Sequence, residues 1–374
     1  KRAVFRSKIP ALRFREIIVN GTTETQKEYL MKVLGHDGKD FFSLQEFKEG
    51  YFKLLSDKKI SEIKPHALFN PADSSYKLIL DVEIKNNIDI AIGANISSST
   101  SNQIYLGVGY KILNQFAQNY NADAYMGKIL NAFSLSSTFK FTEKLPQYFK
   151  LELTNLNYNY FQDNRLFYQE DQPAFIKQHE FFLRSKYGLP AFKNGKIEFG
   201  LAGGILYDKY MQTQLESFSD KNFDRSTYSI LNVSSRYEDN TLNDKQYPIT
   251  GKRNYITLQY LLGIESYQYP DSTGYLSKDD KRLSYFQLSG GLEYYSPLNE
   301  DWILGTKAEF VFNNKRLLDN YSASIIQAPA FAPTLHSKSI FNEGYRSNQY
   351  MALGLTPIWK INPSMFLRSE AYGF

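Results

Sequence analysis

From Ile88 to the end of the chain, apolar residues recur at every second position in short segments. Ile90 and Ile92 continue the pattern, and polar or small residues stand between them. The same alternation returns over residues 131–141, 196–207 and 284–294. A period of two predicts β-strands, because successive side chains leave a pleated strand on opposite faces. Alternating segments of about ten residues separated by polar turns are typical of a transmembrane β-barrel, and we count about thirteen strands over residues 86–374.

In such a barrel, one face of each strand meets lipid and the other faces the lumen. We predict that Ile88, Ile90 and Ile92 face lipid and that Asp89 and Asn95 face the lumen. Shifting the register by one residue would place Asp89 in hydrocarbon, at a cost of kcal/mol order. Tyrosines near strand ends predict aromatic girdles at the two membrane interfaces. These are Tyr158, Tyr160, Tyr207, Tyr210, Tyr255, Tyr260, Tyr267, Tyr269, Tyr294 and Tyr295.

Composition favours the barrel without proving it. The mean hydropathy of −0.44 would usually indicate a soluble protein, but lumen-facing positions and loops lower the average in a barrel. The chain has 29 Tyr and 28 Phe beside 2 Trp and no Cys. A soluble β-sandwich with an aromatic core is the alternative. No apolar run is long enough for a membrane helix. The net charge of +5 is modest and no basic cluster contains aromatics, so nucleic acid is not an expected partner.

The first 85 residues follow a different pattern, which predicts a small α/β domain. Thr22 or Thr23 is placed to cap a helix that Gly35 ends. Ser43 and Glu46 have the spacing of a capping box for a second helix. The expected elements are a strand at 12–21, helices at 23–34 and about 44–55, and strands at 63–69 and 76–84.

Several segments together carry a resemblance to a known family. They are 12–21, 50–57, 96–107, 240–252, 327–334 and 341–350. The order strand, helix, helix, strand, strand resembles a POTRA domain, a periplasmic module that binds polypeptides, and we assign it to residues 12–85. A POTRA-like unit followed by a barrel resembles the BamA-like superfamily, whose members insert or secrete proteins at the outer membrane. Within it, the chain is most similar to the C-terminal region of patatin-like phospholipase-fused proteins.

The resemblance implies a mainly β protein, in which a small α/β POTRA domain precedes an antiparallel barrel of the sixteen-stranded type. The barrel would lie in the Gram-negative outer membrane, with the POTRA domain in the periplasm. Since about thirteen strands are counted, we expect the last ones to lie beyond Phe374. Residues 1–11 would be a linker from an upstream phospholipase-like domain, and an export signal is expected upstream of Lys1. Implied partners are outer-membrane lipid, that upstream domain, unfolded polypeptide at the POTRA edge and a second copy of the chain in a homodimer.

The long segment 313–349 is the strongest candidate for a functional site. It is rich in Ala, Pro and Ser, and loops of this length are uncommon unless they are functional. In the superfamily the corresponding loop folds into the lumen, where an Arg at its tip pairs with an acidic group of the barrel wall. The matching residues here are Tyr345, Arg346 and Asn348 on the loop, and Arg368 and Glu370 on a late strand. A charged pair on a barrel strand is costly toward lipid, so Glu370 would accept a bond from Arg346 inside the lumen. The alternative is a solvated Arg346.

No catalytic residue, cofactor site or metal site emerges from the sequence. A Gly-x-Ser-x-Gly elbow is absent, and the four histidines, His36, His66, His179 and His336, lack metal-ligand spacing. Any lipid hydrolysis would therefore belong to the upstream domain. Three functions stay open for the chain itself. It could anchor or export that upstream domain, it could be a component of a general insertase or translocase, or it could be a diffusion porin, which the POTRA-like unit argues against. The loop 313–349 is expected to plug the lumen.

Overall fold

The structure is a computed structural model of the whole chain. It describes residues 13–36, 42–55, 59–71, 75–96, 102–114, 116–142, 145–161, 175–192, 194–210, 223–271, 274–334, 337, 341–362 and 365–374. The expected linker at 1–11 and His336 lie outside these ranges. The chain divides into two compact units. The first holds residues up to Ile90 together with 108–121 and 137–148, and the second holds the remainder.

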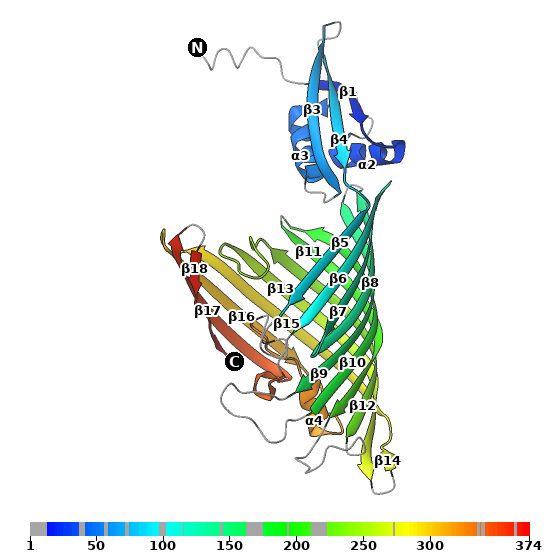
Figure 1. Cartoon of the computed structure of the whole chain (residues 1–374), viewed down its shortest axis with the longest axis vertical. Coiled ribbons are helices and arrows are strands. Elements are labelled where there is room, and N and C mark those ends of the chain that lie inside the picture. Colours follow the sequence, from blue (N-terminus) through cyan, green and yellow to red (C-terminus); the bar gives the residue numbers. More distant parts are fainter. Residues whose placement is uncertain are drawn as a thin grey trace. The chain divides into compact units, whose positions relative to one another are not determined.

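The described part of residues 13–84 is a four-stranded sheet with two helices (Figure 1). Its elements are β1 Arg13–Asn20, α2 Glu24–Leu34, β2 Phe42–Ser43, α3 Leu44–Leu55, β3 Ile60–Asn70 and β4 Ser75–Ile84. The sheet order is β2-β1-β4-β3, in which β1 is parallel to β4 and β3 is antiparallel to β4. The predicted order of strand, helix, helix, strand, strand is confirmed, and β2 is a short addition to it.

Local sequence explains why both helices begin where they do. The side chain of Thr23 accepts a bond from the backbone of Gln26, whose own side chain bonds back to the Thr23 backbone. Gly35 ends α2 in the left-handed conformation, at φ +76°. The backbone N–H and the hydroxyl of Ser43 donate to the Glu46 carboxylate at 2.9 and 2.8 Å. The backbone N–H of Glu46 in turn donates to the Ser43 hydroxyl at 3.2 Å. Both capping predictions are therefore confirmed, with Thr23 as the cap of the first helix.

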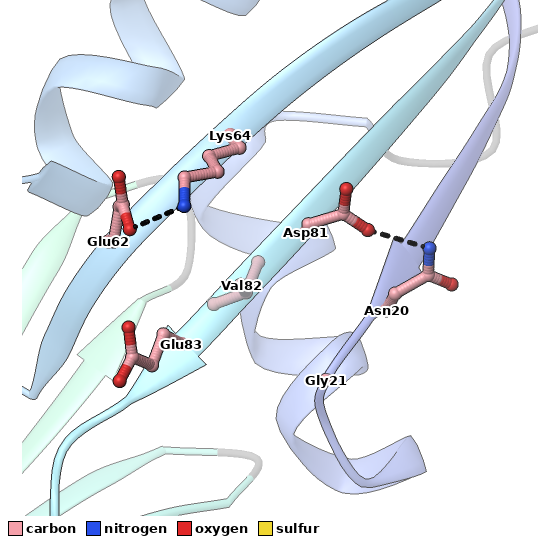
Figure 2. Close-up of a pocket in the computed structure, with 7 residues that line it drawn as sticks. All are labelled: Asn20, Gly21, Glu62, Lys64, Asp81, Val82 and Glu83. Carbon is pink, nitrogen blue, oxygen red and sulfur yellow. Dashed lines mark hydrogen bonds and ion pairs between the residues drawn. The ribbon is translucent and has the colours of Figure 1, made fainter.

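Gly21 is required where β1 ends beside β4. Figure 2 shows Gly21 and Val82 lining one pocket of this sheet. Gly21 has φ +80°, and a Cβ built on it would lie 2.3 Å from the backbone oxygen of Val82. An L-residue would meet both the left-handed strain and this backbone clash, so the position depends on glycine.

We expect Gly21→Ala to destabilise this sheet by roughly 2–4 kcal/mol, from strain plus the clash with Val82. Hydrogen exchange of the β4 amides in the full chain would measure the loss. Gly35→Ala is the matched control, because Gly35 has nearly the same φ but nothing within 4 Å of its Cβ position. It should cost about 1–2 kcal/mol, from strain alone. Equal losses in the two variants would contradict the role given to the Val82 contact.

The strands that the structure describes from Ile88 onward form one large antiparallel sheet, a mainly-β barrel (Figure 1). Its strands are β5 Ile88–Asn95, β6 Gln103–Leu113, β7 Ala117–Gly127, β8 Leu130–Thr142, β9 Pro146–Phe161, β10 Phe175–Ala191, β11 Gly195–Tyr210, β12 Asp224–Asn240, β13 Gly251–Asp271, β14 Gly274–Ser277, β15 Lys281–Pro297, β16 Trp302–Asn313, β17 Gln349–Asn362, β18 Met365–Arg368 and β19 Ala371–Gly373. The main path runs β18-β17-β16-β15-β13-β12-β11-β10-β9-β8-β7-β6-β5, with β14 and β19 beside it. The fifteen described strands less these two give thirteen, the predicted number.

The two faces of the sheet differ in the way that the alternation predicts. On what we call the outer face, apolar side chains stand exposed, as with Val233 at 52% and Leu258 at 51% of their surface. On the inner face, alternate residues of the same strands are buried and often polar, as with Asp208 and Glu265 at 0%. Register carries this division from strand to strand, because Leu201, Val233 and Tyr260 lie side by side on β11, β12 and β13. An exposed apolar face opposite a polar one is the arrangement of a membrane barrel.

Several tyrosines assigned to the aromatic girdles lie on the inner face instead. Tyr210, Tyr267 and Tyr295 are buried there, and Tyr255 and Tyr269 share the side of β13 that holds Glu265, so the assignment of these five to an interface was wrong. The reason is their odd or even position along the strand, since each shares its side of the strand with inner residues such as Asp208 and Glu265.

In the described part of the chain, no helix is long and apolar enough to cross a membrane.

The first alternating segment is strand β5, as predicted. Ile88, Ile90 and Ile92 are exposed, and Asp89 is exposed as well and pairs with Lys111 of β6. Because exposure is high on both sides of this strand, it does not by itself distinguish lipid from lumen. The lipid-facing assignment of β5 therefore stays a prediction.

Candidate functional site

Residues 314–348 connect β16 to β17, and their described part, 314–334, 337 and 341–348, returns over the inner face; we call this described part the docked loop. They contain helix α4, Tyr321–Ile326, and the 3-10 turn η2, Glu343–Tyr345. Asn320 caps α4, since its side-chain oxygen accepts bonds from the backbones of Ser322 and Ala323. The length of this segment was predicted, but its helix was not.

Helix α4 packs against alternate residues of three neighbouring strands. Ala323 and Ile326 are buried at 0% and 4% exposure. They belong to one apolar cluster with Leu318 and Phe341 of the docked loop and Ile176, Phe182, Leu206, Tyr210 and Tyr228 of β10, β11 and β12. Burying these side chains together stabilises the docked position by the hydrophobic effect. The described part of the loop therefore packs on the inner face, while its effect on conduction stays a prediction.

Polar contacts fix the register of the docked loop on the wall. The Gln327 amide donates to the carboxylate of Asp208 at 2.6 Å, and Gln178 donates to its other oxygen at 3.1 Å. Asn320 donates to the hydroxyl of Tyr267 at 3.0 Å. Lys281 of β15 donates to the backbone oxygen of Leu317 at 2.9 Å. Because Asp208 is fully buried, its two amide partners replace the water that an exposed carboxylate would bind.

Arg346 holds the end of α4. Its guanidinium donates to the backbone oxygens of Ile326 at 2.6 Å and Ala328 at 3.3 Å, and lies 4.4 Å from the ring centre of Phe341. The last carbonyls of a helix have no partner within it and carry the negative end of its dipole. A cation at this position therefore stabilises the helix end and ties together the two arms of the docked loop.

The predicted pair of Arg346 and Glu370 is not the arrangement that the structure shows. Glu370 is bound by Arg368, whose Nε lies 2.6 Å away, and by the hydroxyl of Tyr372 at 3.0 Å. Arg368 also donates to the Pro248 backbone oxygen at 3.1 Å and to the Tyr295 hydroxyl at 2.8 Å. Arg368 rather than Arg346 pairs with Glu370, because residues two positions apart in an extended chain point to the same side. Arg346 and Glu370 each have other partners, and whether these residues form a functional site stays a prediction.

The other two loop candidates have structural surroundings. The Tyr345 backbone accepts a bond from Phe331 at 2.8 Å, and its ring lies 5.6 Å from that of Phe374. Phe331 also stacks on Phe374 at 5.9 Å. The side-chain oxygen of Asn348 is buried, without a hydrogen-bond partner among the residues that the structure describes. These contacts join the docked loop to the last residues of the sheet.

A cluster of charges lies beneath the docked loop, and the sequence did not point to it. Glu265 is fully buried on β13, with neither carboxylate oxygen in a hydrogen bond of ordinary geometry within the described chain. Lys315 of the loop donates to the Gln327 backbone at 3.4 Å and lies 5.5 Å from the ring of Tyr285. Burial lowers the pKa of Lys315 to about 8, although Glu265 and Asp208 act in the opposite direction.

Docking of the loop should strengthen as pH rises from 8 toward 10. A lysine in water keeps its proton up to a pKa near 10.4, so between these values the docked loop binds fewer protons than the released one. The gain should reach about 1 kcal/mol by pH 9. The rate at which a thiol label modifies Ala323→Cys measures release, since the chain has no other cysteine. The ratio of this rate to that in Lys315→Met removes the pH dependence of the label, and a ratio constant with pH would contradict the assignment.

Asp208, Gln327, Glu265 and Lys315 were missed because the residues that meet are far apart in sequence. Asp208 and Gln327, for example, are separated by 119 positions. The available signal was weak, namely acidic residues at inner positions of otherwise ordinary strands.

Elsewhere, His179 lies 2.9 Å from the Asn155 side chain and His66 lies 3.4 Å from Asp81. Over the described ranges, no three metal-binding side chains come together.

Solved structures identify the class of fold. BamA from Haemophilus ducreyi lacking POTRA domains 1–3 matches with a TM-score of 0.64 and 15% identity, over 96% of this chain and 71% of that chain. CdiB from Acinetobacter baumannii matches with a TM-score of 0.50 and 9% identity, over 97% of this chain and 63% of that one. No protein-family model and no curated protein matches the sequence. The chain has the fold of a BamA-like outer-membrane barrel.

Proposed function

We propose that this chain is an outer-membrane barrel that moves polypeptide, with residues 13–84 acting as a POTRA domain in the periplasm. The observation that carries the proposal is the docked loop on the polar inner face of a BamA-like sheet. A pore for small solutes would need an open inner face, whereas here α4 and Gln327 occupy part of it. The exposed apolar outer face would bind outer-membrane lipid.

The small α/β domain supports a polypeptide substrate. The match to BamA leaves out 4% of this chain, which is too little to contain residues 13–84. Strand β3 ends the order of the four-stranded sheet, and Leu68 and Phe69 on it are exposed. An edge strand can pair with an extended polypeptide, because its outer backbone groups are available for ladder hydrogen bonds. We assign to this edge the first contact with unfolded substrate.

The substrate we favour is a domain of the same polypeptide. The resemblance to patatin-fused proteins implies a lipid hydrolase ahead of Lys1, which the barrel would export or hold at the membrane. A Gly-x-Ser-x-Gly motif followed by Asp-Gly in the residues before Lys1 would support this, and another kind of domain there would overturn it. A homodimer would place two such domains side by side.

A fusion tests the movement of polypeptide directly. An unstructured segment with an N-terminal epitope is placed ahead of Lys1, and the protein is folded into vesicles that expose residues 13–84 to the outside. Export predicts that the epitope becomes protected from added protease while residues 13–84 are still cleaved. An epitope that stays accessible in the folded barrel would contradict export and favour a simple anchor.

A general insertase is the second candidate, since BamA has the same fold. It would act on separate polypeptides and not only on a fused one. In the same vesicles, an unfolded outer-membrane barrel added outside would then gain protease resistance faster than in vesicles without the chain. Acceleration without export of the fused segment would favour the insertase over the exporter.

A further inference from the structure

A second feature of the inner face lies along four strands, from β10 to β13. Here the wall is hollowed into a pocket of about 490 Å³, whose residues all belong to the second unit. The floor is formed by small residues, Gly200, Ala202 and Ser234. A Cβ on Gly200 would lie 2.5 Å from the Ser234 hydroxyl oxygen, so the hollow at this point depends on a glycine.

The register sets Arg184 and Lys186 along one side of this floor. Arg184 is the neighbour of Ala202, which in turn faces Asn232 on β12. Lys186 is the neighbour of Gly200, which faces Ser234. Amide, hydroxyl and cationic donors therefore surround one hollow.

The pocket holds more positive charge than its own carboxylates neutralise. Its Glu198 lies 3.1 Å from Lys196. Its Glu238 forms ion pairs with two arginines, with Arg236 at 3.4 Å and with Arg253 at 2.8 Å.

Two cations of the pocket, Arg184 and Lys186, make no ion pair within 4 Å in the described ranges, although Arg184 also interacts electrostatically with Glu180 of its own strand. Arg184 donates to the hydroxyl of Thr154 and lies 4.6 Å from the ring centre of Phe182. The side chain of Lys186, whose backbone belongs to the β10–β11 ladder, has no hydrogen bond within the described ranges either. Such a pair of cations attracts anionic groups, most strongly where water is partly excluded.

The spacing of the two cations matches an extended polypeptide. Arg184 and Lys186 are two residues apart on one strand, so their Cα atoms are roughly 7 Å apart. An extended chain repeats its side chains on one face with the same spacing of roughly 7 Å. A Glu-x-Glu sequence would therefore bring one carboxylate to each cation, while adjacent acids would point to opposite sides.

We propose that this pocket binds acidic, extended segments of polypeptide, with Arg184 and Lys186 as the residues that recognise two carboxylates in an acid-x-acid spacing. The inference rests on the proposed movement of polypeptide and names the chemical class of segment that the barrel favours. The pocket opens on the polar inner face and not on the apolar outer one, so a lipid head group is not the occupant we favour.

Three labelled peptides of one length test this, containing Glu-Ala-Glu, Gln-Ala-Gln or Glu-Glu-Ala within the same neutral sequence. Their binding to the folded chain in detergent is measured by fluorescence anisotropy at low salt. The Glu-Ala-Glu peptide should bind at least tenfold more tightly than the Gln-Ala-Gln peptide and severalfold more tightly than the Glu-Glu-Ala peptide. Added salt should reduce the difference.

Variants assign the effect to the pocket. Arg184→Gln/Lys186→Gln should remove the preference for the acidic peptide, and Lys186→Gln alone should remove part of it without loss of a structural contact. Lys128→Gln/Arg316→Gln removes two exposed loop cations and should keep the preference. Loss of the preference in this control would overturn the assignment, because it would reduce the effect to net charge.

The remaining outcomes separate this inference from the proposed function. Equal binding of the Glu-Ala-Glu and Gln-Ala-Gln peptides would overturn acid recognition and leave polypeptide binding intact. Absence of all peptide binding beside successful export of the fused epitope would overturn the pocket alone. Displacement of the acidic peptide by inorganic phosphate at equal concentration would show a small-anion site and would also overturn the proposal.

Discussion

Replacing Arg346 with alanine is expected to release the docked loop from the inner face. The guanidinium is the donor to two backbone oxygens at the end of α4 and lies against the ring of Phe341. Hydrogen bonds from a charged donor are worth about 1.5–3 kcal/mol, and partly buried carbonyls would be left without a partner. We expect a loss of about 3 kcal/mol in docking, which corresponds to roughly a hundredfold faster modification of Ala323→Cys by a thiol label.

Two further variants show whether this effect is specific. Arg316→Ala removes an exposed arginine of the same loop and should leave the labelling rate unchanged. Glu370→Ala should also leave it unchanged, since Glu370 is bound by Arg368 and Tyr372. An acceleration by Glu370→Ala that does not add to that of Arg346→Ala would instead restore the pair inferred from the family.

Gln327→Leu is expected to have an effect of similar size for a different reason. It removes the shorter of the two hydrogen bonds to the buried Asp208 and leaves a carboxylate with Gln178 as its remaining amide partner. Removing one hydrogen-bond partner of a buried charge costs about 3–5 kcal/mol, which is more than the net contribution of the hydrogen bond itself. Labelling of Ala323→Cys should again accelerate, by at least about two orders of magnitude.

The double variant Asp208→Leu/Gln327→Leu separates the two contributions. Without the carboxylate, no buried charge is stranded, and two leucines can pack against the neighbouring apolar cluster. Docking in the double variant should therefore be stronger than in Gln327→Leu alone. A double variant that is weaker than either single one would show that the contact is worth its own hydrogen bond and that the buried charge matters little.

Local sequence sufficed for helices α2 and α3 and for which side of each strand is apolar. Thr23, Ser43 and Glu46 act within three residues of their partners, so their capping roles do not depend on the rest of the fold. The alternation around Val233 and Leu258 likewise reports directly which side is apolar. The alternation does not distinguish an apolar side that faces lipid from one that a loop covers. Tyr210 and Tyr267 face inward because they have the parity of Asp208 and Glu265.

The site required contacts that no local pattern records. Asp208 meets Gln327 only because the docked loop folds back over β11. The family resemblance predicted that Arg346 pairs with Glu370, but each side chain binds a group that lies nearer to it. Arg368 lies two positions from Glu370, and the end of α4 lies beside Arg346. Helix α4 itself is six residues long and held by packing, so periodicity gave no sign of it.

The central claim is that one face of this sheet meets lipid while the other is a polar, partly covered wall. Spin labels at Val233 and Leu258 on the outer face, and at Ser234 and Gln259 on the inner face, test it in bilayers. Collision with dissolved oxygen should be frequent at the first two positions and rare at the others, and collision with a water-soluble nickel chelate should be rare at the first two. Equal access of both reagents to neighbouring positions would contradict the account.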